Sequence, residues 1–129
     1  MNWQNFSPRV VIFMVSFYQT VKNAFMPEIR RTITNTFKDA QECEMFIIIL
    51  KQKWSEFDGK LSDKFTVEIA TDVADPCRHT AYLTAQSVED FKIVDEWAKR
   101  EVIPLRDKLA PKSNTFTCEL YASFEFSGD

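Results

Sequence analysis

The densest group of reactive side chains lies in one short stretch, residues 72–79. This stretch contains two carboxylates, a thiol, a guanidinium and the chain's single imidazole within eight residues, in the order Asp72-Val-Ala-Asp75-Pro-Cys77-Arg78-His79. If a strand begins at Cys77, then Cys77 and His79 share one face of it. The two side chains could then form an activated thiolate, or ligate a metal ion together with Asp75.

The same stretch also fits a simple hairpin turn. Asp-Pro initiates turns, and charged residues are common at hairpin tips. Catalytic partners usually come from different elements of a fold, not from neighbouring positions in one strand. We therefore expect neither a catalytic residue nor a metal ligand here, and we keep Arg78 and His79 as candidate binding residues.

Two further acidic groups are weaker candidates. Glu42 and Glu44 flank Cys43, and Glu119 follows Cys118. Paired carboxylates can divide acid and base roles when their environments differ. Nothing in the surrounding sequence predicts a pocket that would separate their pKa values. Solvated edges of the fold are the expected location.

Composition excludes several kinds of site. The chain has only 2 Gly in 129 residues, and neither lies where a strand leads into a helix. Phosphate-binding loops, dinucleotide fingerprints and nucleophile elbows all require glycine at such places. A single His excludes the two-His zinc motifs, and the three Cys show no zinc-ligand spacing. We expect no cofactor.

The charge distribution argues against a nucleic-acid partner. The net charge is −3, with eight basic against six acidic residues in 1–60 and eight against thirteen in 61–129. Phosphate contacts require clustered Lys or Arg. The apolar run at residues 10–18 is shorter than the roughly 20 residues that span a bilayer. We expect a cytoplasmic protein with reduced thiols and no membrane contact.

The first half of the chain predicts three elements. Arg9–Phe17 is apolar on both alternating faces and favours a strand, although Ser7-Pro8 would also suit a helix start. Apolar residues recur every four positions from Val21 to Phe37, which predicts a helix over 23–40. Three successive isoleucines in Glu44–Trp54 favour a strand. A helix remains open there, because Asp39-x-x-Glu42 and Gly59 resemble helix start and stop signals.

The second half has clearer periodicity. Strands are predicted over 65–69 and 80–86, because apolar and polar residues alternate in the first and β-branched and aromatic residues occur in the second. Ser87 begins a helix that Pro104 interrupts near Ile103, and a short continuation follows at Leu105–Leu109. In Phe116–Phe126, one alternating set is apolar and the other mostly polar. This pattern predicts a final strand with Phe116, Phe124 and Phe126 in the core.

These elements follow the order β-α-β-β-β-α-β within a single domain, residues 1–129. The order indicates an α+β protein whose helices cover one face of a sheet. In element order, the chain resembles the ferredoxin-like fold with one extra strand.

The predicted outer surface favours a protein partner. The outward set on the last strand, Glu119, Tyr121 and Glu125, would repel a phosphate backbone. Tyrosine is enriched at protein interfaces, so Tyr82 and Tyr121 are candidate contact residues. The partner would be another protein or a second copy of the chain.

Two functions are compatible with these observations. The first is an acidic interaction module without chemistry of its own, acting as a regulator, inhibitor or adaptor. An accessory protein of a virus would be one example of such a module. The alternative is a small-molecule enzyme of the dimeric α+β-barrel type, with an apolar pocket into which Tyr82, Arg78 or His79 points. A closed apolar cavity would favour the enzyme, and a solid core would exclude it.

Overall fold

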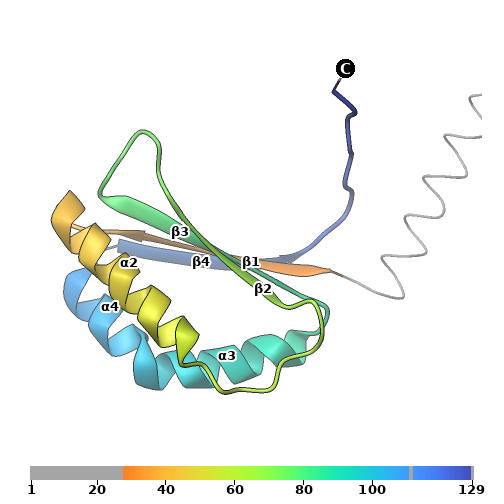
Figure 1. Ribbon diagram of the computed structural model, residues 1–129, viewed down its shortest axis with the longest axis horizontal. Coiled ribbons are helices and arrows are strands. Elements are labelled where there is room, and N and C mark those ends of the chain that lie inside the picture. Colours follow the sequence, from red (N-terminus) through yellow and green to blue (C-terminus); the bar gives the residue numbers. More distant parts are fainter. Residues whose placement is uncertain (1–27, 111, 129) are drawn as a thin grey trace, which may run out of the picture.

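The computed structural model describes residues 28–110 and 112–128 of the chain. Its four strands and three helices are shown in Figure 1. In chain order they are β1 (Ile29–Thr36), α2 (Ala40–Ser55), β2 (Thr66–Thr71), β3 (Arg78–Ala85), α3 (Val88–Glu101), α4 (Ile103–Leu109) and β4 (Lys112–Glu119). The predicted strand Arg9–Phe17 lies outside the described residues.

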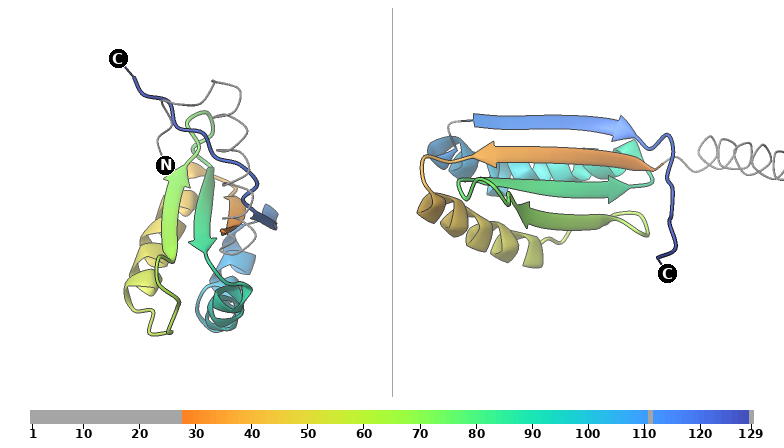
Figure 2. Two further views of the ribbon diagram at one scale, coloured as in Figure 1. Left: turned by 90° about the vertical axis from the view of Figure 1, so that its right-hand side faces the viewer. Right: turned by 90° about the horizontal axis from the view of Figure 1, so that it is seen from above.

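The four strands form one antiparallel sheet in the order β2-β3-β1-β4. The described helices all lie on one face of this sheet, and no helix of the described residues lies on the opposite face, called the open face below (Figure 2). The described chain is therefore a two-layer α+β structure, with β1 and β3 as its central strands.

The predicted helix over 23–40 is wrong where the structure describes it, because residues 29–36 form β1. The four-residue spacing that suggested a helix also fits a strand, since every even spacing returns to the same strand face. Ile29 and Ile33 face the helices and pack in the core. Threonines and arginines fill the other positions, and this β-branched content favours the strand.

The predicted strand Glu44–Trp54 is also wrong, because these residues belong to α2. The Asp39 side chain caps the helix by accepting a hydrogen bond from the Glu42 N–H at 2.8 Å. Cys43, Phe46 and Leu50 are buried at helical spacing. The N-cap and this stripe together outweigh the strand preference of the three isoleucines.

Most of the second half folds as predicted. β2 and β3 form a hairpin, and the Ser87 side chain caps α3 by accepting from the Glu89 N–H. The helix breaks at Val102, with Pro104 in the first turn of α4. Proline has no N–H to donate and is tolerated only in a first turn, which explains this break.

The last predicted strand is only partly correct. β4 ends at Glu119, and the following residues extend away from the sheet (Figure 1). Phe116 pairs with Thr32 on the open face and is 60% exposed, so it is not a core residue. Phe124 and Phe126 are also exposed. Alternation correctly predicted a strand but could not show which face the helices cover.

The core between the layers has two clusters. The first, beneath α3, contains Ile29, Leu83, Phe91 and Val94. The second, around α2, contains Phe37, Cys43, Phe46 and Leu50. Trp54 of α2 contacts Trp97 of α3 with ring centroids 4.5 Å apart. This contact joins the two helices over the middle of the sheet.

Candidate functional site

A cavity of about 180 Å³ lies between the sheet and the helices. Ile33, Ala81 and Leu83 of the two central strands line it from the sheet side. Apolar side chains of all three helices also line it, namely Leu50, Trp54, Val94, Trp97, Val102 and Ile103. An engineered cavity of about 150 Å³ binds benzene in another protein. This cavity is therefore large enough for a small aromatic molecule.

The bend between α3 and α4 contributes to the cavity wall. α3 ends at Glu101 and α4 begins at Ile103, so Val102 lies at the break. Val102 and Ile103 both line the cavity, as does Arg106 from the first turn beyond Pro104. Thr115 lines it from the edge strand β4.

Two polar side chains are buried at one position of the cavity wall. Asn35 of β1 and His79 of β3 are cross-strand neighbours, and Asn35 Nδ2 lies 3.1 Å from His79 Nε2. Asn35 is 3% exposed and His79 is fully buried. The imidazole stacks on Phe37 and contacts Phe46, with ring centroids 5.8 and 5.3 Å away. Burial lowers the pKa of His79 to about 4, so the imidazole is neutral at neutral pH.

This pair has two unsatisfied atoms. Asn35 Oδ1 and His79 Nδ1 are buried and have no hydrogen-bond partner among the described residues. An unpaired buried polar group costs about 1–3 kcal/mol. Buried polar atoms in native proteins are nearly all paired, by protein, water or a bound molecule. Both residues line the cavity, so the unsatisfied pair lies in its wall.

An ion pair forms a second polar part of the cavity wall. Arg31 Nη1 donates to Asp95 Oδ1 at 2.5 Å, and Arg31 Nε donates to Thr117 Oγ1 at 3.0 Å. The guanidinium also lies over the Phe91 ring, 4.4 Å from its centroid. Arg31 is four residues before Asn35 on the same strand face, a separation of about 13 Å. The cavity thus has polar groups toward both ends and apolar walls between them.

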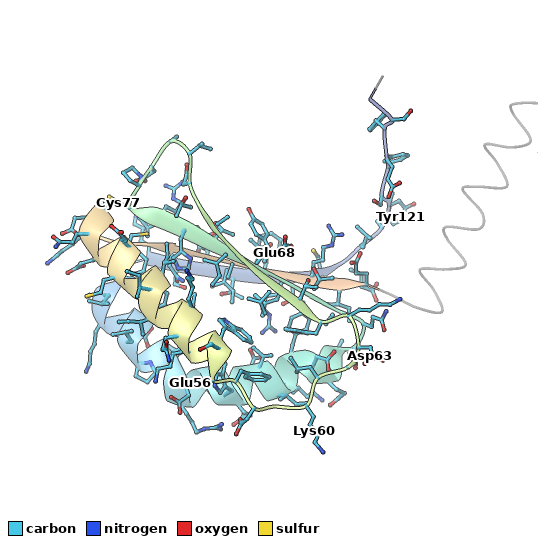
Figure 3. All side chains as sticks on the ribbon, viewed as in Figure 1. Glu56, Lys60, Asp63, Glu68, Cys77 and Tyr121 are labelled. Carbon is cyan, nitrogen blue, oxygen red and sulfur yellow. The ribbon has the colours of Figure 1, made fainter. Side chains whose placement is uncertain are left out.

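The candidate residues from the sequence do not form one site. His79 lies in the cavity, whereas Arg78 begins β3 on the open face and pairs with Asp72 and Asp75 at 3.2 and 3.5 Å. Tyr82 is on the open face and 46% exposed. Glu119 ends the edge strand, and Tyr121 and Glu125 lie in the exposed segment beyond it, where Figure 3 places Tyr121 away from the helices.

The thiol next to His79 has no features of an activated nucleophile. Cys77 lies in the turn before β3, near the start of α2 in Figure 3, and its N–H donates to Asp75 Oδ1 at 2.9 Å. Burial and the neighbouring Asp75 carboxylate raise the pKa of the Cys77 thiol. Among the described residues, no group of three His, Cys, Asp or Glu side chains could hold a metal ion.

Sequence reasoning missed most of the cavity residues. Arg31 and Asn35 were assigned to a helix, so their position opposite β3 was not visible. Trp54 was assigned to a strand, so its contact with Trp97 was not expected. The signal that could have found both Arg31 and Asn35 is their place in the alternation of Ile29, Ile33 and Phe37, where these two polar residues interrupt an apolar face.

No known protein family and no curated protein match the sequence. The structure is similar to a dimeric ferredoxin-like protein from an uncultured marine organism, with a TM-score of 0.60, 16% identity and coverage of 83% of this chain and 99% of that one. It also resembles a protein of Chloroflexus aurantiacus, provisionally named an antibiotic biosynthesis monooxygenase (TM-score 0.54, 17% identity, coverage 78% and 99%). A Bordetella bronchiseptica protein has the same provisional name (TM-score 0.52, 15% identity, coverage 74% and 99%).

These likenesses show the fold. The chain is ferredoxin-like. This confirms the fold class expected from the sequence. The expectation of an interaction module without chemistry is overturned, because the neighbours include proteins named as monooxygenases. In the part of the chain that the structure describes, no helix is long and apolar enough to cross a membrane.

The low pKa of His79 makes stability depend on pH. The unfolded chain has a histidine pKa near 6.5 and takes up the proton first, so the free energy of unfolding falls as pH drops from 6.5 towards 4. Between about pH 7 and about pH 5 we expect a loss on the order of 2 kcal/mol from this residue. Urea unfolding of wild type and His79→Phe at both pH values measures it. An equal pH dependence in both proteins would contradict the assignment.

Proposed function

We propose that the chain is a homodimeric small-molecule enzyme that binds a mostly apolar substrate between the sheet and the helices. The observation that carries this proposal is the cavity, with apolar walls and two unpaired polar atoms at Asn35 and His79. Ligand pockets commonly combine apolar walls with a few placed polar groups. A core packed only for stability would not need buried polar atoms without partners.

The names of the structural neighbours support one reaction class. Three of them are named as antibiotic biosynthesis monooxygenases, two provisionally. The reaction we propose to test first is therefore an oxidation by dioxygen in which the bound molecule itself supplies the four electrons, one oxygen atom enters the product and the other leaves as water. Oxygen uptake in the presence of small aromatic compounds that bind the cavity measures this reaction.

The open face supports a homodimer. Glu68, Tyr82, Thr32 and Phe116 form one row across all four strands, as the pairing of the strands shows. In Figure 3, Glu68 lies on the side of the sheet away from the helices. Tyr82 and Phe116 are 46% and 60% exposed, and half of the positions next to this row on the same face are threonines. Two structural neighbours are named as dimeric ferredoxin-like proteins. We propose that a second copy covers this face.

Charge introduced on the open face should separate the dimer. We expect Phe116→Arg to weaken dimerisation by at least about tenfold, because the guanidinium would be buried without a partner. Ile48→Arg is the matched control, since Ile48 is also 60% exposed but lies on α2. Sedimentation over a range of concentrations measures both. A monomeric wild type, or a Phe116→Arg protein that dimerises as wild type does, would contradict the homodimer.

A bulky side chain in the cavity should block binding. Ala98 of α3 lines the cavity, whereas Ala40 is exposed at the start of α2. Iodobenzene, a small aromatic quencher, should quench the fluorescence of Trp54 and Trp97 in the wild type. We expect Ala98→Phe to weaken this binding by at least about tenfold, because the added ring fills the space, and Ala40→Phe to leave it unchanged. Equal quenching curves for the three proteins would show that the cavity is not the binding site.

A further inference from the structure

We infer that Asn35 and His79 form a recognition site for an uncharged ligand group that carries both a hydrogen-bond donor and an acceptor. The inference rests on the proposed function, since it concerns the same cavity and names the class of molecule that fits it. It is independent of the reaction that the enzyme performs.

The hydrogen bond between the two side chains determines what each has left to offer. The amide nitrogen Asn35 Nδ2 can only donate, so His79 Nε2 accepts and carries no proton. In a neutral imidazole the proton is then on Nδ1. The unpaired atoms are therefore one donor, His79 Nδ1–H, and one acceptor, Asn35 Oδ1.

One unpaired donor and one unpaired acceptor also remain if the Asn35 amide group is rotated by 180°, which exchanges its oxygen and nitrogen. The amide oxygen would then accept from Nε2–H, and the unpaired atoms would be a donor on Asn35 and an acceptor on His79. In both orientations the pair presents one donor and one acceptor to its surroundings. A ligand that matches the pair needs one of each.

Packing alone does not explain why these residues are polar. His79 is fully buried and packs against the rings of Phe37 and Phe46. The next cross-strand pair on this face, Ile33 and Ala81, is apolar and also lines the cavity. Replacing both members of a buried polar pair by apolar groups of similar shape is close to neutral for stability. The polar pair therefore provides recognition that an apolar pair would not.

The rest of the cavity wall narrows the ligand class. A hydrocarbon would leave both polar atoms unpaired. An anion would find no free positive charge at this position, because the imidazole is neutral and the Arg31 guanidinium is engaged by Asp95 and Thr117. The second guanidinium of the cavity wall, that of Arg106, is paired with Asp107 at 3.2 Å. The volume of about 180 Å³ fits a small ring system. A ring that bears a carboxamide or a hydroxyl group meets all three requirements.

Three probes of nearly the same shape test the inference: benzamide, acetophenone and benzoate. Benzamide offers a donor and an acceptor, acetophenone an acceptor only, and benzoate is charged. We expect benzamide to bind the full chain at least about tenfold more tightly than either other probe, as measured by nuclear magnetic resonance titration. Because water hydrates an amide more strongly than a ketone, apolar burial alone would favour acetophenone.

The double variant Asn35→Leu with His79→Phe is the reference protein. It keeps the shape of the site and removes both polar groups, so the preference for benzamide over acetophenone should fall below about threefold. A cooperative thermal unfolding transition of the double variant, like that of the wild type, would show that it keeps the fold. The wild-type comparison stands by itself if this variant does not fold.

Two results would overturn the inference, and they differ. If benzamide and acetophenone bind the wild type equally, the recognition site is wrong while the cavity remains a binding site. If no probe binds, the inference and the proposed binding function both fail. If the double variant keeps the wild-type preference, another part of the cavity selects the amide, and the role given to Asn35 and His79 is wrong.

Discussion

The hydrogen bond between Asn35 and His79 joins the two central strands of the sheet within the buried layer. It connects β1 to β3 at the level where Phe37 and Phe46 enclose the imidazole, so it links the sheet to α2. Burial keeps the imidazole neutral, and the bond itself orients both side chains. The two polar atoms that remain unpaired give this end of the cavity its chemical character. Without this pair, this end of the cavity would be apolar.

A single layer of helices imposes a second constraint. Side chains of a strand alternate between the two faces of a sheet, so the described helices, all on one side, leave the other face without helical cover. On the helix side, the apolar residues of β1, β2 and β3 form the core. On the open face threonine is the commonest residue, beside four charged side chains and with Tyr82 and Phe116 in one row. A second copy over this face would bury those rings and leave the cavity between sheet and helices unobstructed.

The sequence predicted the fold class and most of the second half of the chain, where strong local signals agree. Ser87 caps a helix, Pro104 breaks it, and the hairpin strands have β-branched or alternating residues. The first half failed because two patterns were ambiguous. A four-residue spacing fits both a helix and a strand face, and the three isoleucines of α2 conceal a helix that Asp39 begins. Local preference could not decide these cases, because the deciding contacts join residues far apart in the chain.

The candidate site was also hard to predict, because it too depends on contacts between residues far apart in the chain. His79 was identified as a candidate, but its neighbour Asn35 lies 44 residues earlier and was assigned to the wrong kind of element. Only the register between β1 and β3 brings them together. The open-face position of Phe116 likewise depends on which side of the sheet the helices occupy. Pairing and layer order are properties of the whole fold, which periodicity in one segment does not contain.

The central claim is that the cavity ends in a buried, neutral imidazole with a fixed tautomer. Because His79 is the only histidine, the nitrogen-15 resonances of imidazole in the folded protein belong to it alone. A pH titration of these resonances should show a single neutral tautomer that remains uncharged down to about pH 5. Protonation centred near pH 6.5, or rapid exchange between the two tautomers, would contradict the account, because both require an imidazole that water can reach.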